Sequence, residues 1–223
     1  MRQLALDLPH QTQLGLDDFV ISPANAAAHD LIMRWPDWPA PVAVLVGPAG
    51  SGKTHLAAVW RKRAGAVLLE ADPALSGLTE GFTALADNMP GALSETGLFH
   101  LINHARERHG TVLLAARAHP SAWPVALPDL ASRLRAAPVV EIGQPDDALL
   151  RNVLAKLFHD RQIRADEALL SYLLVRMPRS LEAARTMVAA IDRYALEQRA
   201  EVSRALVARM LTSLEQPGLF DGA

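Results

Sequence analysis

Cysteine is absent from the 223-residue sequence, which excludes disulfide bonds and metal sites built on cysteine. Long apolar runs are also missing, because no stretch approaches the roughly 20 residues that span a bilayer. The start MRQLALDLPH is too short and too soon acidic for a signal peptide. A net charge of -2 gives no reason to expect direct binding to nucleic acid or to a membrane surface. We therefore expect a soluble cytoplasmic protein without a membrane partner.

Apolar residues, in contrast, make up 50% of the chain, enough for a sizeable core. Short apolar runs of the buried-strand type alternate with helical patterns up to residue 143, and this alternation favours a parallel sheet covered by helices on both faces. The strand candidates are 42–46, 66–71, 82–87, 111–117 and 138–143. After Gln144 only helical spacing remains, in four segments.

These patterns divide the chain into four parts. Residues 1–18 lack clear periodicity and are interpreted as a flexible arm. Residues 19–145 form the α/β domain, residues 146–214 form a small helical domain, and residues 215–223 form a tail. The change from mixed to all-helical pattern is the strongest indication of a domain boundary.

One motif carries specific chemistry. The segment GPAGSGKT (47–54) fits the phosphate-loop pattern G-x-x-x-x-G-K-[ST], with an apolar strand before it and a helix starting within it. The glycines allow successive N–H groups to face an anion, and the helix adds its positive end. Lys53, one of only three lysines, places a charge at the β- and γ-phosphates, while Thr54 offers a hydroxyl to Mg²⁺. The predicted phosphate site comprises Gly47, Pro48, Ala49, Gly50, Ser51, Gly52, Lys53, Thr54 and His55.

Nucleotide hydrolysis also requires carboxylates that bind the metal shell and orient water. The strand FTALAD supplies one, Asp87, at its end. The alternative is an ordinary strand that ends in the turn DNMPG.

The sequence resembles the DnaA/Hda family of AAA+ proteins, particularly the short Hda-type regulators of the replication initiator DnaA. The resemblance rests on FVISPANAAAHDL (19–31), GPAGSGKTHLAAVW (47–60), the segment 127–158 that contains SRL, and RSLEAARTMV (179–188). It implies an AAA+ P-loop domain with a five-stranded parallel sheet, followed by a small C-terminal helical lid domain.

The resemblance also implies roles for individual residues. The segment before the first strand would contact adenine through Phe19, Val20 and Asn25. Arg133 matches the arginine finger that acts on a partner's ATP, although it could instead form a surface ion pair. Arg179 matches the sensor-2 position, although it could be a solvated residue at a helix start.

Two departures from the family pattern weaken the expected hydrolysis. The first acid of the family's acidic strand aligns with Ala86, and the sensor-1 position aligns with Ala115 or Ala116. We expect ADP or ATP to bind, with Mg²⁺ at Thr54 and Asp87, and we expect the chain's own ATPase activity to be weak.

The two ends of the chain contain candidate binding peptides. QLALDLP resembles the peptide by which Hda-type proteins bind the sliding clamp of DNA polymerase III, with Gln3, Leu4, Leu6 and Leu8 as the contacts. A packing segment or a strand is the alternative. QPGLF (216–220) fits a looser clamp pattern. We expect no helix-turn-helix domain after the lid, and we expect DNA contact only through the clamp.

The function that the resemblance implies is negative regulation of replication initiation by stimulating hydrolysis of DnaA-bound ATP. A homodimer is compatible with this role. The alternatives are a nucleotide-binding adaptor of the clamp or DnaA without stimulatory activity, and an autonomous ATPase that remodels another protein.

Overall fold

A computed structural model describes residues 19–215 of the chain. Its strands all run parallel in one five-stranded sheet with the order β2-β3-β4-β1-β5, which confirms the predicted fold class. The strands are β1 (Val42–Val46), β2 (Val67–Leu69), β3 (Thr83–Met89), β4 (Thr111–Ala116) and β5 (Val139–Glu141).

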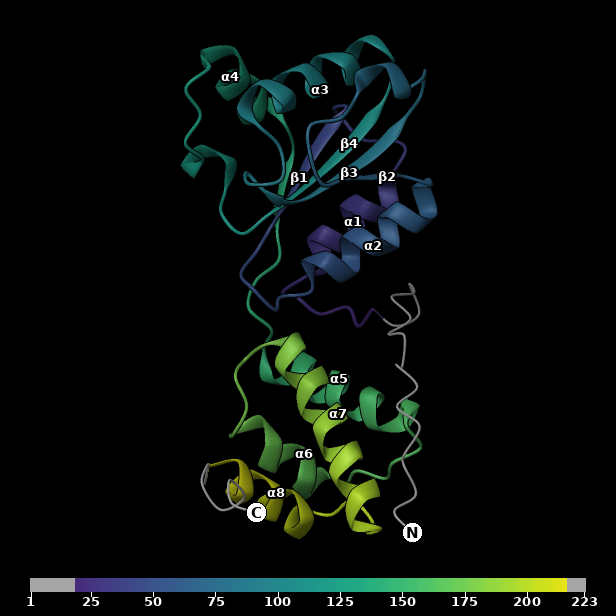
Figure 1. The fold of residues 1–223 in the computed structure, drawn as a ribbon, viewed down its shortest axis with the longest axis vertical. Helices are drawn as coiled ribbons and strands as arrows, with labels where there is room; N and C mark the ends of the chain where they lie inside the picture. Colours follow the sequence, from purple (N-terminus) through teal and green to yellow (C-terminus); the bar gives the residue numbers. More distant parts are fainter. Residues whose placement is uncertain (1–18, 216–223) are drawn as a thin grey trace, which may run out of the picture.

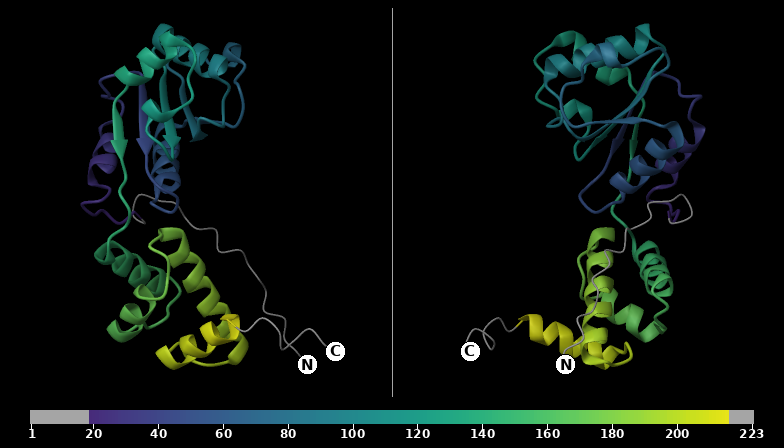
Figure 2. Two further views of the ribbon diagram at one scale, coloured as in Figure 1. Left: turned by 90° about the vertical axis from the view of Figure 1, so that its left-hand side faces the viewer. Right: turned by 45° about the vertical axis from the view of Figure 1, so that its right-hand side comes forward.

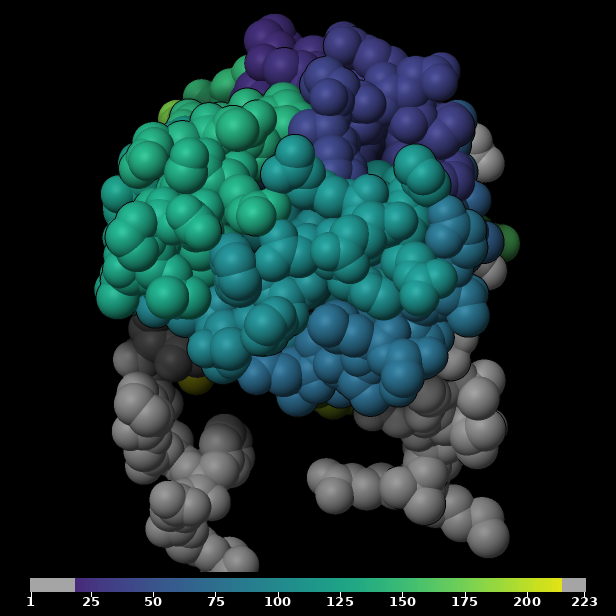
Figure 3. Space-filling view, turned by 90° about the horizontal axis from the view of Figure 1, so that it is seen from above, coloured from purple at the N-terminus to yellow at the C-terminus, as the bar shows by residue number. Residues whose placement is uncertain are grey.

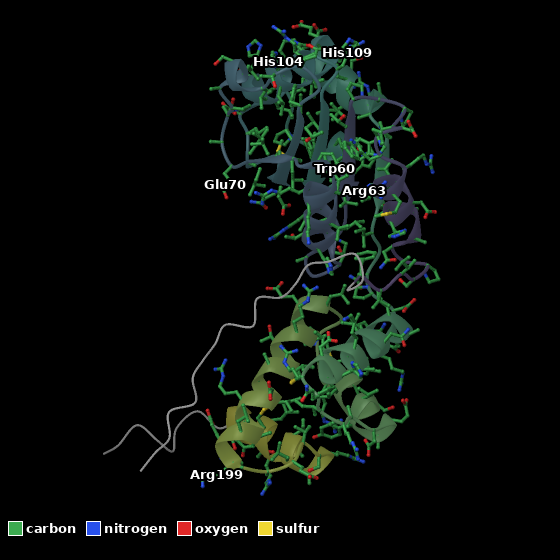
Figure 4. All side chains as sticks on the ribbon, turned by 90° about the vertical axis from the view of Figure 1, so that its right-hand side faces the viewer. Trp60, Arg63, Glu70, His104, His109 and Arg199 are labelled. Atoms are coloured by element: carbon green, nitrogen blue, oxygen red, sulfur yellow. The ribbon has the colours of Figure 1, made fainter. Side chains whose placement is uncertain are left out.

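Helices cover both faces of this sheet (Figures 1 and 2). Alternate residues of β1 belong to two different cores, because successive side chains of a strand point to opposite faces. Val44 packs in the core that includes Leu98 and Leu130, and Leu45 packs in the core that includes Trp60, which lies inside the α/β unit (Figure 4). The covering elements are α1 (Ala26–Arg34), α2 (Lys53–Ala64), α3 (Glu95–Glu107) and α4 (Pro128–Ala136), with short 3₁₀ turns η2 (Leu75–Gly77) and η3 (Pro120–Ala122).

The four remaining helices form a separate lid around its own apolar core. Three of them begin at a side-chain cap: Asp146, Asp166 and Ser180 each accept a hydrogen bond from a backbone N–H three residues further on. Such caps satisfy N–H groups that the first helical turn leaves unpaired. The lid helices are α5 (Asp147–Asp160), α6 (Glu167–Leu174), α7 (Leu181–Gln198) and α8 (Arg204–Glu215).

The carboxyl edge of the sheet faces the lid. His109, just before β4, lies at the end of the α/β unit away from the lid, so the strands run from that end toward the lid (Figures 1 and 4). Two segments meet at the junction, where the Gly143 N–H donates to the Ala24 carbonyl over 2.8 Å. None of the helices in residues 19–215 is long and apolar enough to cross a membrane.

Candidate nucleotide site

The predicted phosphate loop connects β1 to α2 at this carboxyl edge. Gly50 and Gly52 have φ angles of 72° and 100°, in the left-handed region that glycine adopts without strain. The Gly47 N–H donates to the Ala116 carbonyl over 3.2 Å, which ties the first residue of the loop to the end of β4. Because α2 begins at Lys53, the loop and the positive end of the helix together form an anion-binding concavity.

Lys53 is buried at the base of this loop, and its ammonium group donates to the Pro48 carbonyl over 2.8 Å. Burial lowers the pKa of Lys53 below its ordinary value of 10.5. Asp87 opposes this shift in the Lys53 pKa, and the Arg117 guanidinium adds to it. The local charge is therefore incompletely balanced, and a bound anion would stabilise the ammonium form.

Asp87 is turned toward the loop by an irregularity in β3. The pairing of β3 with β4 shifts register between Ala86 and Met89, and Asn88 within this bulge has a φ of 63°. The Asp87 carboxylate accepts from the Asn88 N–H over 2.7 Å and from the Thr54 hydroxyl over 3.3 Å. These two contacts hold the carboxylate beside Thr54, where a metal shell would form.

This geometry shows which residue of the acidic strand lies beside the loop. Ala86 is 0% exposed and belongs to the core against α3, so position 86 does not face the site. Asp87 is therefore the carboxylate beside Thr54, and the amide side chain of Asn88 follows it in the chain.

The two alanines that align with the sensor-1 position are buried as well. Ala115 and Ala116 are both inside β4, with exposures of 0% and 1%, so neither side chain reaches the site. The first residue beyond the strand is Arg117, whose side chain is exposed and close enough to Lys53 to affect its charge. The sequence interpretation missed Arg117; a polar residue directly after an apolar strand was the available signal.

The residues present fit a nucleotide phosphate. The Ser51 hydroxyl lies in the loop, is 1% exposed and has no hydrogen-bond partner within the described chain. An orphaned buried hydroxyl of this kind requires a partner, and a phosphate oxygen would provide one. Residues 19–215 contain no group of three or more His, Cys, Asp or Glu that could hold a metal, so Mg²⁺ at Thr54 and Asp87 would depend on phosphate oxygens.

The segment proposed to contact adenine bridges the two units. Phe19 lies edge-on to His55 at 5.5 Å between ring centroids, and Val20 packs against the lid core. Asn25 is 1% exposed; its amide donates to the Val20 carbonyl and its oxygen accepts from the Ser22 N–H. Its side chain therefore fixes the shape of this segment, whereas Phe19 and Val20 present the apolar surface.

The lid contacts the phosphate loop directly. The Leu181 N–H donates to the Gly50 carbonyl over 2.9 Å, and Arg185 on α7 lies 3.0 Å from His55 Nδ1 on α2. Arg179, the predicted sensor-2 residue, instead pairs with Asp147 over 2.9 Å, and both side chains are more than half exposed. Arg185 was not predicted, although its position one turn after Leu181 places it on the same helix face.

Arg133 lies on α4 in a different part of the molecule. The residue is half-buried, and its guanidinium carbon lies 5.3 Å from the centroid of the Phe99 ring, a cation–π contact. Helix α4 is on the surface of the α/β unit at the end away from the lid, whereas the phosphate loop contacts the lid (Figures 1 and 3). The structure therefore does not bring Arg133 into the chain's own phosphate site. The clamp peptide at Gln3, Leu4, Leu6 and Leu8 and the QPGLF segment lie outside the described residues.

No family model and no curated protein matches the sequence. Solved structures do match: domain III of the Thermotoga maritima replication initiation protein DnaA aligns with a TM-score of 0.74 and 17% identity, over 92% of this chain and 98% of its own. The chain has a DnaA-like AAA+ fold. The Thermotoga maritima RuvB Holliday junction branch migration motor aligns with a TM-score of 0.70 and 16% identity, over 90% and 72%. AMPPCP-bound DnaA from Aquifex aeolicus gives 0.65 and 16%, over 83% and 67%.

Proposed function

We propose that this protein is a nucleotide-binding, Hda-like regulator that stimulates hydrolysis of ATP bound to DnaA. The proposal rests on the distance between the phosphate loop and Arg133 within one chain. A phosphate loop with Lys53, Thr54 and Asp87 lies against the lid, and Arg133 is presented on α4 at the other end of the α/β unit. An arginine placed there can reach the site of a neighbouring molecule but not its own.

The chain's own site supports nucleotide binding better than turnover. Lys53, the loop N–H groups and the Ser51 hydroxyl would bind phosphate, and Mg²⁺ beside Thr54 would neutralise phosphate charge. Asn88 follows Asp87, and an amide cannot accept a proton from water as a carboxylate does. We expect ADP or ATP to be bound and ATP to be hydrolysed slowly by the protein alone.

The partner assignment follows from similarity and from the arm. DnaA domain III has the same fold, and a DnaA-like surface would be compatible with side-by-side docking of the two proteins. We propose that residues 3–8 bind the sliding clamp, so that the clamp raises the local concentration of the regulator near DnaA. The Phe99 ring would hold the Arg133 guanidinium in place before docking, which reduces the entropy lost at the interface.

Radiolabelled ATP hydrolysis by DnaA, with clamp-loaded DNA, tests this proposal. Wild-type protein should accelerate hydrolysis, and Arg133→Ala should remove most of the acceleration, because an arginine finger contributes roughly 10³–10⁵ in rate in related systems. Arg135→Ala is the matched control: Arg135 is exposed on the same helix and has no described partner.

Arg133→Ala should bind the clamp in a pull-down and should bind nucleotide as wild type does. Deletion of residues 3–8 should abolish clamp binding and leave nucleotide binding unchanged. If wild type binds the clamp but never stimulates DnaA, the protein is an adaptor. Rapid ATP turnover by the purified chain without DnaA would instead identify an autonomous ATPase. Equal stimulation by Arg133→Ala and wild type would show that the finger assignment is wrong.

A further inference from the structure

Helix α4, which carries Arg133, begins without a capping group of its own. The side chain of its N-cap residue, Leu127, cannot accept a hydrogen bond, and Pro128 at the first helical position has no N–H. Leu130 stands three residues after the N-cap, where a capping box has a Glu or Gln that bonds back to the N-cap N–H. Because Leu130 is apolar, the Leu127 N–H has no side-chain acceptor within α4.

Glu95 on the neighbouring helix supplies this acceptor. It is half-buried at the first position of α3, and its carboxylate accepts a hydrogen bond from the Leu127 N–H. The two helices are in contact at the end of the α/β unit away from the lid (Figure 1). Within residues 19–215 this is the only hydrogen bond of the Glu95 side chain, so its one described role is to hold the start of α4.

Apolar packing gives the first turn of α4 limited support. Of the nine residues in the helix, Leu130 and Leu134 are buried. A cavity of about 190 Å³ lies beside the first turn, and its lining includes Trp123, Leu130 and Glu95. Since side chains that face a cavity lack dispersion contacts on that side, the bond from Glu95 is a major constraint on where α4 begins.

We propose that Glu95 is a positioning residue for the arginine finger: its bond to the Leu127 N–H fixes the start of α4, and thereby the direction in which Arg133 points toward a partner's ATP. This inference rests on the proposed function. Arg133 lies less than two helical turns beyond Leu127, so a tilt of the first turn displaces its guanidinium. The Phe99 ring contacts the guanidinium itself, and Glu95 provides a second fixed point on the same short helix.

The test is the maximal stimulation of DnaA ATP hydrolysis on clamp-loaded DNA, measured together with the concentration of this protein that gives half of it. Glu95→Ala should lower the maximal stimulation about 10-fold, because a hydrogen bond to a charged group changes an equilibrium by about that factor or more. The half-maximal concentration should change less than about 3-fold, because the surface that meets the partner keeps its residues. Glu95→Gln keeps an acceptor oxygen and should recover most of the stimulation. Glu107→Ala is the matched control, since Glu107 is an exposed carboxylate at the other end of α3.

Removal of the donor tests the same bond from the other helix. Leu127→Pro deletes the N–H, and the φ of -75° at Leu127 suits proline. Leu127→Ala keeps the N–H and is the reference. Relative to this reference, Leu127→Pro should also lose about 10-fold in maximal stimulation, and adding Glu95→Ala should cause little further loss, because both changes remove one bond.

Hydrogen exchange and urea unfolding separate positioning from general stability. The Ala131 amide donates to the Leu127 carbonyl in the first turn of α4, and it should exchange faster in Glu95→Ala while the urea midpoint of the chain stays unchanged. A loss of stimulation that follows a loss of global stability, without recovery in Glu95→Gln, would refute the role of Glu95.

The two proposals fail in different ways. If Arg133→Ala abolishes stimulation but Glu95→Ala and Leu127→Pro stimulate as their references do, or if the losses of these two variants multiply, Glu95 does not position the finger and the proposed function stands. If wild type never stimulates DnaA, or if Arg133→Ala stimulates as wild type does, both proposals are overturned.

Discussion

Gly50 joins the phosphate loop to the lid. Its substitution by alanine should reduce stability through backbone strain and through a steric clash with the lid. At φ 72° an alanine is strained, which costs roughly 1–2 kcal/mol. Its Cβ would also lie 2.8 Å from the Ser180 Cβ and closer still to the Ser180 hydroxyl. Overpacking of this kind adds about 1–3 kcal/mol, so Gly50→Ala should lower the unfolding free energy by about 2–5 kcal/mol.

Gly65 provides the reference for the backbone term. Its φ is 63°, but a Cβ added there would meet nothing within 4 Å. Gly65→Ala should therefore cost only about 1–2 kcal/mol. Ser180→Gly removes the colliding side chain and costs a few tenths of a kcal/mol as a lost cap. The double variant Gly50→Ala/Ser180→Gly should recover about 1–3 kcal/mol relative to Gly50→Ala.

Urea unfolding of these four variants and wild type gives the coupling energy directly. Hydrogen exchange at the Leu181 amide, which donates to the Gly50 carbonyl, reports whether the lid has lost its contact with the loop. We expect faster exchange in Gly50→Ala and partial recovery in the double variant. The reasoning fails if Gly50→Ala costs no more than Gly65→Ala, or if removing the Ser180 side chain restores nothing.

Two further predictions concern the α/β core and the buried lysine. A Cβ at Gly110 would lie 2.6 Å from Phe82 Cδ1, so Gly110→Ala should lower the unfolding free energy by about 1–3 kcal/mol. Gly77→Ala should have little effect, because a Cβ at Gly77 would meet open space. Thermal unfolding compares the two variants, and equal melting temperatures would contradict the packing argument. The pKa of Lys53 is lower in the folded state than its ordinary value of 10.5, so the unfolded chain binds more protons at pH values between the two. The free energy of unfolding should therefore rise with pH in that interval, and Lys53→Met should remove this rise. Identical pH dependence of wild type and Lys53→Met would refute the assignment.

The sheet was predictable because its strands contain short apolar runs, and β1, which is apolar throughout, has the predicted bounds 42–46. The same property makes strand ends hard to place: a strand buried on both faces has no alternation of polar and apolar residues. The burial of Ala86 and Ala115, which the resemblance aligns with site positions, could therefore not be read from the sequence. The bulge that turns Asp87 toward Thr54 has no sequence signal of its own.

Helix α4 was not predicted as a helix. It has nine residues, and only Leu130 and Leu134 of them are buried, so the apolar pattern is too short to recognise. The contact of Arg185 with His55 depends on how the lid is placed against α2, and the contact of Arg179 with Asp147 depends on how α5 and α7 pack within the lid. No local pattern specifies either arrangement. The sequence thus predicted a loop between β1 and α2 as the phosphate site, but not which lid arginine contacts α2.

The position of Phe19 has a consequence for the arm that precedes it. Phe19 packs against the α/β core, and the next residue, Val20, packs against the lid core. The described structure therefore begins at the junction between the two units. If residues 3–8 bind the clamp as proposed, a force on that tether would reach both units through these two adjacent residues.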